Sequence, residues 1–288
     1  MQDPFHYDEA FSRNIGWVTR EEQAKLRSKR VAIAGLGGVG GVHLLTLTRL
    51  GVGKFSLADF DRFSLVNFNR QAGATVSSLD QPKLDVMIRQ ALDINPSLDI
   101  RPFPQGLTAD NLEAFLEGVD LYIDGLDFFA LNIRQQVFAA CRARGIPAIT
   151  VAPLGMGAAL LNFLPGKMSF EDYFGLGNQP EAEKALRFFI GLAPAKLQMG
   201  YLVDPSAVDL PNRRGPSTMM ACMLCAGIAG SEGLKILLGR GKVLAAPWGV
   251  HFDAYTNRLK RTWRPGGWHN PLQRFWLALF RKHLTRAR

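Results

Sequence analysis

The chain has 288 residues, of which 47% are apolar and 20% charged, a composition that supplies a buried core and excludes an intrinsically disordered protein. The formal net charge is +9, and the whole excess lies in residues 258–288, which carry nine basic and no acidic residues. Three cysteines are too few for a disulfide framework and favour a reducing, cytoplasmic location.

The first half of the chain alternates strand and helix signals. After a helix and connector over residues 8–28, apolar runs predict strands at 31–35, 55–59, 98–103, 121–124 and 147–151. Helical periodicity predicts helices at 39–50, 80–93, 108–117 and 129–144. This alternation is typical of right-handed βαβ units, so we expect an α/β fold: a Rossmann-like, doubly wound, mainly parallel sheet with helices on both faces.

The second half is less regular. Glycine and proline interrupt residues 152–217, for which we predict an insertion or crossover region with one helix near 181–190. The apolar run 218–238 contains an acidic and a basic residue, which favours a buried helix over a membrane span. A strand-like run follows at 243–255. We therefore treat residues 1–257 as one domain and residues 258–288 as a basic, aromatic-rich tail.

A glycine-rich motif follows the first predicted strand, in the sequence Val31-Ala-Ile-Ala-Gly-Leu-Gly-Gly-Val-Gly40. Glycines allow a tight turn and a close approach of the backbone to a phosphate, and the helix start offers free N–H groups to an anion. Asp59 closes the next predicted strand, where an acceptor for ribose hydroxyls belongs. Alone, this pattern predicts a nucleotide site, with a nicotinamide dehydrogenase as the default.

Charged and polar residues downstream favour ATP instead. They are Asp61, Asn67, Arg70, Gln71, Lys83, Asp124 and Asp127, with Arg13 near the start of the chain. A nucleotidyl-transfer site needs cations to neutralise a triphosphate and a carboxylate to hold Mg²⁺. A dehydrogenase needs no such set. We interpret Arg134 as a structural ion-pair partner, and Asp124 either as a cap of the following turn or as a supporting residue.

In order and spacing these residues resemble the ThiF/MoeB/HesA family, the adenylating enzymes related to the ubiquitin-activating E1 core. The motifs that carry the resemblance are Gly35-x-Gly-Gly-x-Gly, Asp59-Phe-Asp61, Asn67-x-x-Arg70-Gln71, Lys83 and Asp127. The resemblance extends from about Ala10 to Thr150, and more faintly through 218–238.

The resemblance implies a role for each motif residue. The implied nucleotide-binding set is Gly35, Gly37, Gly38, Gly40, Asp59, Asp61, Asn67 and Gln71, and the implied catalytic set is Arg13, Arg70, Lys83 and Asp127. The glycines would cradle the phosphates, Asp59 would accept from the ribose, and Asp61 would support that loop. Asn67, Arg70 and Lys83 would contact phosphates, while Asp127 would bind Mg²⁺. Arg13 would reach the ATP of the neighbouring subunit, which implies a homodimer.

The chemistry that this set implies is adenylation. A carboxylate oxygen attacks the α-phosphorus of ATP, pyrophosphate leaves, and an acyl-adenylate forms. A carboxylate needs no general base, so catalysis depends mainly on alignment and charge neutralisation. The expected substrate is the C-terminus of a peptide or small protein, or a small carboxylate.

The sequence departs from the family pattern in its cysteines. Many members carry two Cys-x-x-Cys pairs that bind zinc, whereas this chain has only Cys222-Met-Leu-Cys225 and no cysteine in 152–217. Two thiols cannot complete a tetrahedral site, so we expect packing cysteines and no structural zinc. The usual crossover-loop nucleophile is missing too, which predicts direct transfer to an acceptor without an enzyme thioester. Phe128 also stands where many relatives have Asn after the metal-binding Asp.

The function of the tail and two alternative functions stay open. Residues 258–288 combine basic residues with aromatic ones, namely Trp263, Trp268, Phe275, Trp276 and Phe280. This composition fits contact with tRNA, peripheral contact with an anionic membrane, or packing on the body or on a partner. A tRNA-modifying dehydratase of the same family is one alternative function. A non-catalytic E1-like scaffold is the other, although it predicts loss of phosphate-binding residues that this chain retains.

Overall fold

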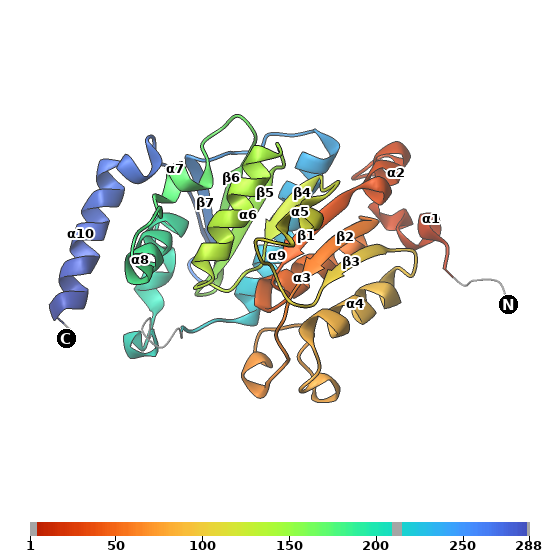
Figure 1. Cartoon of the computed structure of the whole chain (residues 1–288), viewed down its shortest axis with the longest axis horizontal. Helices are drawn as coiled ribbons and strands as arrows, with labels where there is room; N and C mark the ends of the chain where they lie inside the picture. The colour runs from red at the N-terminus through yellow and green to blue at the C-terminus, as the bar shows by residue number, and fades with distance from the viewer. Residues whose placement is uncertain (1–4, 209–214, 287–288) are drawn as a thin grey trace.

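The computed structural model describes residues 5–208 and 215–286, with side chains as far as Arg281. Eight strands form one sheet in the order β3-β2-β1-β4-β5-β6-β7-β8. The parallel strands are β1 (Arg30–Ala34), β2 (Lys54–Ala58), β3 (Asp99–Phe103), β4 (Leu121–Asp124) and β5 (Ala148–Leu154). The antiparallel strands are β6 (Gly157–Phe163), β7 (Trp248–Asp253) and β8 (Arg258–Trp263). The expected Rossmann-like, mainly parallel sheet is confirmed (Figure 1).

Two strands lie where none was predicted. β6 falls inside residues 152–217, because the chain turns at Gly155, with a φ of +60°, and returns antiparallel to β5. Its side chains are buried from end to end, so they show no alternation. β8 comes from the first residues of the basic tail and pairs only with β7, so the boundary at 257/258 falls inside a hairpin.

Ten α-helices surround the sheet in the described part of the chain. They are α1 (Tyr7–Ala10), α2 (Arg20–Ser28), α3 (Gly38–Leu50), α4 (Lys83–Ile94), α5 (Leu112–Leu116), α6 (Leu131–Ala143), α7 (Phe170–Phe174), α8 (Glu181–Leu192), α9 (Met219–Leu238) and α10 (Pro271–Arg286). α4 begins later than the predicted residue 80 because Pro82 stands at its N-cap. α5 is shorter than the predicted 108–117, because Asn111 accepts from the Thr108 N–H in a turn before it.

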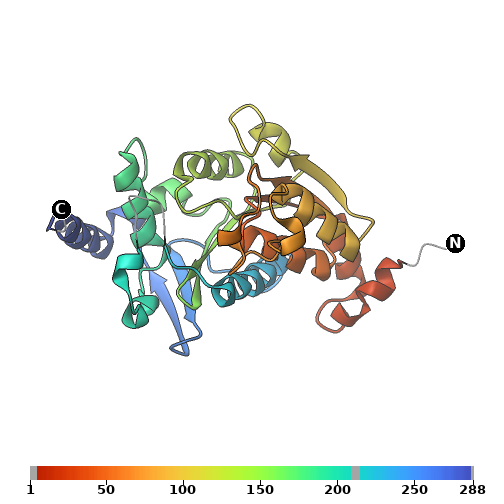
Figure 2. The same ribbon diagram turned by 90° about the horizontal axis from the view of Figure 1, so that it is seen from below.

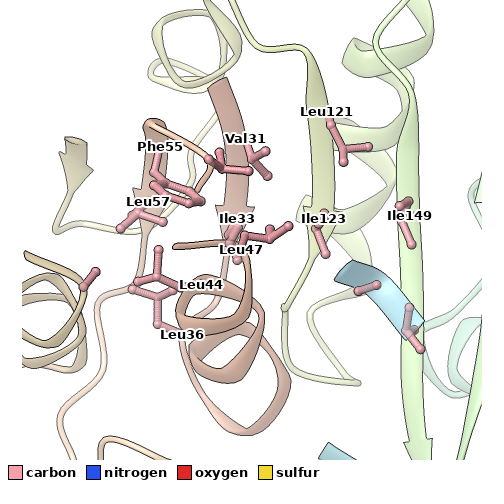
Figure 3. Close-up of a cluster of buried hydrophobic side chains, with 14 of the residues drawn as sticks. Val31, Ile33, Leu36, Leu44, Leu47, Phe55, Leu57, Leu121, Ile123 and Ile149 are labelled. Carbon is pink, nitrogen blue, oxygen red and sulfur yellow. The ribbon is translucent and has the colours of Figure 1, made fainter. Parts of the chain in front are cut away.

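One face of the sheet packs against α3, α4 and α9. Alternate residues of the strands supply its apolar side chains, which are Val31, Ile33, Phe55, Leu57, Leu121, Ile123 and Ile149 (Figure 3). α3 contributes Leu44 and Leu47, which lie over these strand residues (Figure 3). The period of two along each strand sets which residues meet the helices.

The helices α6, α7 and α8 cover the other face of the sheet (Figure 2), and an aromatic cluster lies beneath them. We define it as Phe138, Phe163, Phe170, Tyr173, Phe174 and Phe188, whose rings lie mostly edge-on or tilted at centroid distances from 4.3 to 6.2 Å. Both faces of the parallel strands are therefore covered, as a parallel sheet requires.

α9 packs along α3 and against β5 and β6. Its inner side, including Cys225, Ala229 and Gly233, is buried, whereas Met220 and Met223 on its outer side are exposed. Thr218 caps its start and Gly239 ends it in the left-handed conformation. Within the described residues it is the one helix whose length and apolar composition would also suit a membrane span.

Candidate active site

The predicted motifs meet at the carboxyl ends of β2, β1 and β4, which are neighbours in the sheet. The chain runs from β1 to β2 and β3 on one side, and from β4 to β5 on the other. β1 and β4 therefore flank the point where the strand order reverses, which is where open α/β sheets bind ligands. The glycine loop follows β1, Asp59 follows β2, and Asp127 lies three residues past β4.

The glycine loop is packed backbone against backbone. Gly35 has a φ of +82°, and Gly37 is the N-cap of α3. A Cβ atom on Gly40 would overlap the carbonyl oxygen of Gly35, and one on Gly125 would lie 2.9 Å from the Cα atom of Gly40. Three glycines from two loops thus bring the start of α3, where a helix has N–H groups without intrahelical partners, close to the strand ends. Gly125 was not singled out from the sequence, although it stands between Asp124 and Asp127.

Asp59 joins the two loops that follow β1 and β2. One of its carboxylate oxygens, Oδ2, accepts from the Leu36 N–H in the glycine loop at 2.6 Å. Oδ1 accepts from the Asp61 N–H at 2.8 Å. Burial raises the pKa of Asp59, while these two backbone donors act in the opposite direction. A carboxylate retains further acceptor sites after two such hydrogen bonds. Asp59 can therefore join the two loops and still accept from a ribose hydroxyl, as predicted.

Lys83 is the first residue of α4 and is buried, with 6% of its surface exposed. Its ammonium nitrogen lies 3.0 Å from Oδ2 of Asp61, and its backbone N–H donates to the Asp61 carbonyl oxygen at 2.9 Å. Asp61 is half exposed. The pair therefore fixes a cation beside Asp59, at the edge of the glycine loop.

The segment from Asn67 to Gln71 lies beside the glycine loop. Asn67 accepts from the Ser64 N–H at 3.0 Å and so holds a short 3-10 turn at Leu65–Asn67. The Arg70 side chain lies against Gly38, and the Gln71 amide lies against Gly37. Gln71 is buried, yet its Oε1 atom has no hydrogen-bond partner in the protein. An acceptor left unpaired at this position favours a ligand or water donor.

A buried ion pair supports the loop that carries Asp127. Nε of Arg134 lies 2.8 Å from Oδ2 of Asp124, and both side chains are almost fully buried. Thr150 on β5 donates to the same oxygen at 2.9 Å. Nη2 of Arg134 donates to the carbonyl oxygens of Leu126 and Asp127 at 2.7 and 3.0 Å. The interpretation of Arg134 as a structural ion-pair partner is confirmed, and Asp124 supports the same loop.

Asp127 itself presents an exposed carboxylate, whose Oδ1 accepts from the Phe129 N–H at 3.0 Å. No group of three His, Cys, Asp or Glu residues suited to a metal ion occurs among the residues described. Mg²⁺ commonly binds through one or two carboxylates together with substrate phosphates and water. A single exposed carboxylate near the glycine loop fits that mode of binding and does not fit a metal cage built by the protein alone.

Arg13 is the one predicted site residue that the fold does not bring to this place within a single chain. It is exposed on a 3-10 turn at Ser12–Asn14. The adjacent Asn14 donates to the carbonyl oxygen of Leu50, at the end of α3 opposite to the glycine loop. A helix of 13 residues is about 20 Å long, so Arg13 is remote from the other predicted residues.

Cys222 lies closer to the site than its sequence position indicates. Its Sγ atom lies 3.1 Å from the position of a Cβ atom on Gly38. Burial raises the pKa of the Cys222 thiol, although Arg70 acts in the opposite direction, and burial raises the pKa of Cys225 still further. Both are packed into α9 as predicted. A buried, protonated thiol is a poor nucleophile.

Comparisons with known proteins indicate the family and the fold of this chain. A family model described as the ThiF family matches residues 11–270. A tRNA threonylcarbamoyladenosine dehydratase from Bacillus subtilis (strain 168) is 36% identical over 150 residues, which cover 52% of this chain and 57% of the relative. A sulfur carrier protein ThiS adenylyltransferase from Escherichia coli (strain K12) is 34% identical over 148 residues, or 51% and 58% of the two chains. These matches span little more than half the length of each relative.

Two solved structures share the fold. The crystal structure of E. coli MccB with ATP has a TM-score of 0.65 at 18% identity, covering 90% of this chain and 73% of that chain. The crystal structure of the E. coli tRNA N6-threonylcarbamoyladenosine dehydratase, TcdA, has a TM-score of 0.60 at 19% identity, covering 81% of this chain and 95% of that chain.

Proposed function

The chain belongs to the ThiF family, and we propose that it uses ATP and Mg²⁺ to adenylate a carboxylate and passes the acyl group directly to an acceptor. The observation that carries this proposal is the meeting of the glycine loop, the Lys83–Asp61 pair, Arg70 and Asp127 at adjacent strand ends. A binding loop, two cations and one carboxylate are what transfer at an α-phosphorus requires.

Each part has a role in the proposed reaction. The N–H groups at the start of α3 bind phosphate oxygens, and Asp59 accepts from the ribose hydroxyls. Lys83, held by Asp61, and Arg70, beside Gly38, stabilise the negative charge that develops on the phosphates. Asp127 would hold Mg²⁺, which supplies further charge neutralisation when bound. The attacking carboxylate is already ionised, so alignment by these residues replaces general-base catalysis.

The state of the cysteines supports the proposed direct transfer without an enzyme thioester. All three are buried and form no disulfide. Burial raises the pKa of each thiol, to about 12 for Cys141. A thiol in that state does not supply the thiolate that an acyl transfer needs. Free thiols also fit the cytoplasmic location that we propose.

Exchange of labelled pyrophosphate into ATP tests the adenylation step, measured over a panel of peptides with free C-termini and of small carboxylates. We expect exchange with at least one of them, and its loss when Mg²⁺ is chelated. Lys83→Ala and Asp127→Ala should abolish exchange, whereas Asp85→Ala, two residues further along α4 on its exposed side, serves as the matched control. No ATP binding and no exchange with any candidate would refute the proposal. Undiminished exchange in both variants would refute the site assignment.

A tRNA-modifying dehydratase is the second candidate function. The observation that favours it is the 36% identity to the B. subtilis dehydratase over half of this chain. It predicts that tRNA stimulates the production of AMP from ATP. Equal AMP production with and without tRNA would exclude it and leave a peptide or small carboxylate as the substrate.

We further propose that the active form is a homodimer in which Arg13 completes the partner's site. Arg13 is exposed and remote from the site of its own chain. Mixing two inactive variants, Arg13→Ala and Lys83→Ala, should restore part of the exchange activity, because some mixed dimers contain one intact site. Either variant remixed with itself is the control. Failure of the mixture to regain activity, with subunit exchange shown independently, would contradict the shared site.

A further inference from the structure

Among its described residues, α10 packs on α8 through one apolar side and carries exposed apolar side chains on a second side. On the packed side, Leu277 is buried against Leu186 and Ile190 of α8. Gln273 is also buried there and donates to the Tyr173 carbonyl oxygen at 3.3 Å. This side is what joins the helix to the body of the protein.

The other side carries a second apolar stripe, which we define as Leu272, Phe275 and Leu279. Leu272 and Phe275 are 54% and 59% exposed, and Leu279 is partly exposed. The spacing of three and four residues places all three on one side of the helix. α10 lies at the outer edge of the molecule, beyond α8 (Figure 1).

The helix holds this stripe in a fixed position. Nε of Arg281 lies 3.1 Å from a carboxylate oxygen of Glu183. The ammonium group of Lys196 lies over the ring of Trp276, an attractive cation–π arrangement. These contacts act on the packed side and at the end of the helix. The stripe is therefore presented to the outside by an ordered helix.

The net charge of residues 258–288 indicates which kind of surface the stripe binds. Residues 258–288 contain nine basic residues and no acidic ones, whereas the rest of the chain has 25 of each sign. Arg274 is exposed on α10, and the sequence beyond Arg281 adds Lys282, Arg286 and Arg288. Apolar side chains next to several cations are the composition of a helix that lies on an anionic lipid surface.

We propose that α10 docks on an anionic membrane surface, with the stripe of Leu272, Phe275 and Leu279 inserted at the level of the lipid headgroups. The net positive charge of residues 258–288 attracts the lipid phosphates. An RNA surface fits less well, because two of the three stripe residues are aliphatic and offer no flat face for a base to stack on. This interaction is independent of the proposed adenylation and would bring the enzyme to the membrane.

Co-sedimentation of the full chain with vesicles tests the proposal, using phosphatidylcholine alone and phosphatidylcholine mixed with phosphatidylglycerol. We expect binding to the anionic vesicles, weaker binding to the neutral ones, and weakening by salt. The double variant Leu272→Ser/Phe275→Ser should bind about tenfold less tightly or worse, because it removes two large apolar groups from the lipid. Ala278→Ser, exposed on α10 but outside the stripe, is the matched control and should bind as the unmodified chain does.

Four outcomes of these experiments would contradict docking on a membrane. Thermal unfolding first confirms that the variants remain folded. Absence of binding to anionic vesicles by the folded chain would overturn the proposal, as would equal binding by the double variant. Binding of tRNA that depends on Phe275, without binding to vesicles, would assign the stripe to RNA instead. A dimer in solution that the double variant disrupts would assign it to a second copy of the chain.

Discussion

The glycine loop and the aromatic cluster are both buried, but they are packed by different means. In the loop, backbone atoms of Gly35, Gly40 and Gly125 approach so closely that no side chain fits between them. In the cluster, six large rings fill the space between the antiparallel half of the sheet and α6, α7 and α8. The loop therefore depends on glycines that carry no side chain, whereas the cluster depends on large side chains that fill the space.

This difference has consequences for substitution. Close backbone packing leaves no side chain that could move aside, so even one added methyl group must displace a strand end or a helix. Aromatic rings that are held only by van der Waals packing can shift by small amounts when one of them is replaced by a smaller apolar group. We therefore expect substitutions of the glycines at the site, in the parallel half of the sheet, to be strongly destabilising. Substitutions in the aromatic cluster, in the antiparallel half, should each lower the unfolding free energy by a smaller amount.

The largest effect is expected from Gly40→Ala. The new Cβ atom would overlap the carbonyl oxygen of Gly35, which should cost about 3 kcal/mol or more of unfolding free energy and abolish ATP binding. Urea unfolding and a nucleotide titration measure the two effects. Gly227→Ala on the exposed side of α9 is the control, since its Cβ would meet nothing within 4 Å. It should stabilise the protein by about 0.5–1 kcal/mol, because alanine is the better helix former.

The next effect concerns the ion pair that supports the Asp127 loop. Arg134→Met leaves the Asp124 carboxylate buried without its partner and should cost about 3 kcal/mol of unfolding free energy. Arg142→Met on the same helix is the control, because Arg142 is exposed and lies 3.9 Å from Asp172; it should cost less than about 1 kcal/mol. Urea unfolding compares the two variants. Equal costs would show that the buried pair does not hold this loop.

The sequence was most informative where the pattern is local. The apolar runs that alternate with helical periodicity predicted five parallel strands, and the run from Val31 to Gly40 predicted the position of the loop. β8 escaped prediction because its residues are basic and mostly exposed. It is a strand only through its pairing with β7, and no local pattern records that pairing.

The prediction of the site was limited in the same way, because contacts between distant segments leave no local pattern in the sequence. The motifs from Gly35 to Asp127 were predicted to form one site, whereas the individual side-chain contacts between distant segments were not predicted. Thr150 reaches Asp124 only because the register aligns β5 with β4, and Cys222 reaches Gly38 only because α9 packs along α3. Apolar periodicity predicts that such elements are buried, but it does not specify which residues of two buried elements meet.

A smaller effect is expected in the aromatic cluster, from Phe174→Leu. Phe174 is fully buried and contacts Phe163, Phe170 and Phe188. Leucine removes part of the ring volume, and its neighbours can partly close the space, so we expect a loss of about 1–2 kcal/mol. ATP affinity at temperatures where the variant is folded should be unchanged. A matching loss of ATP affinity would show that the two halves of the sheet are coupled and that the contrast between them is wrong.

The smallest effect is expected at the start of α7, on the edge of the same cluster. Ser169 accepts from the Asp172 N–H at 2.9 Å, and the Asp172 carboxylate accepts from the Ser169 N–H at 3.2 Å. Ser169→Ala should cost about 1 kcal/mol at neutral pH, as the loss of a helix cap usually does. The hydrogen bond from the Ser169 side chain lowers the pKa of Asp172. A carboxyl with a lowered pKa stabilises the fold above its unfolded pKa and loses that contribution as the pH falls.

The cost of Ser169→Ala should therefore shrink on acidification, once Asp172 is protonated in the folded state as well. Urea unfolding of both proteins at neutral pH and at about pH 3, below the ordinary pKa of aspartate, measures this change, because the contribution is lost progressively as the pH falls from the unfolded pKa towards the lowered folded pKa. Asp172→Asn supplies the control, since its stability relative to the unmodified chain should follow the same pH dependence. A cost that is equal at both values would show that the hydroxyl alone caps α7. A local cap of this kind changes the stability of the aromatic half while leaving the glycine loop, and hence ATP binding, as it was.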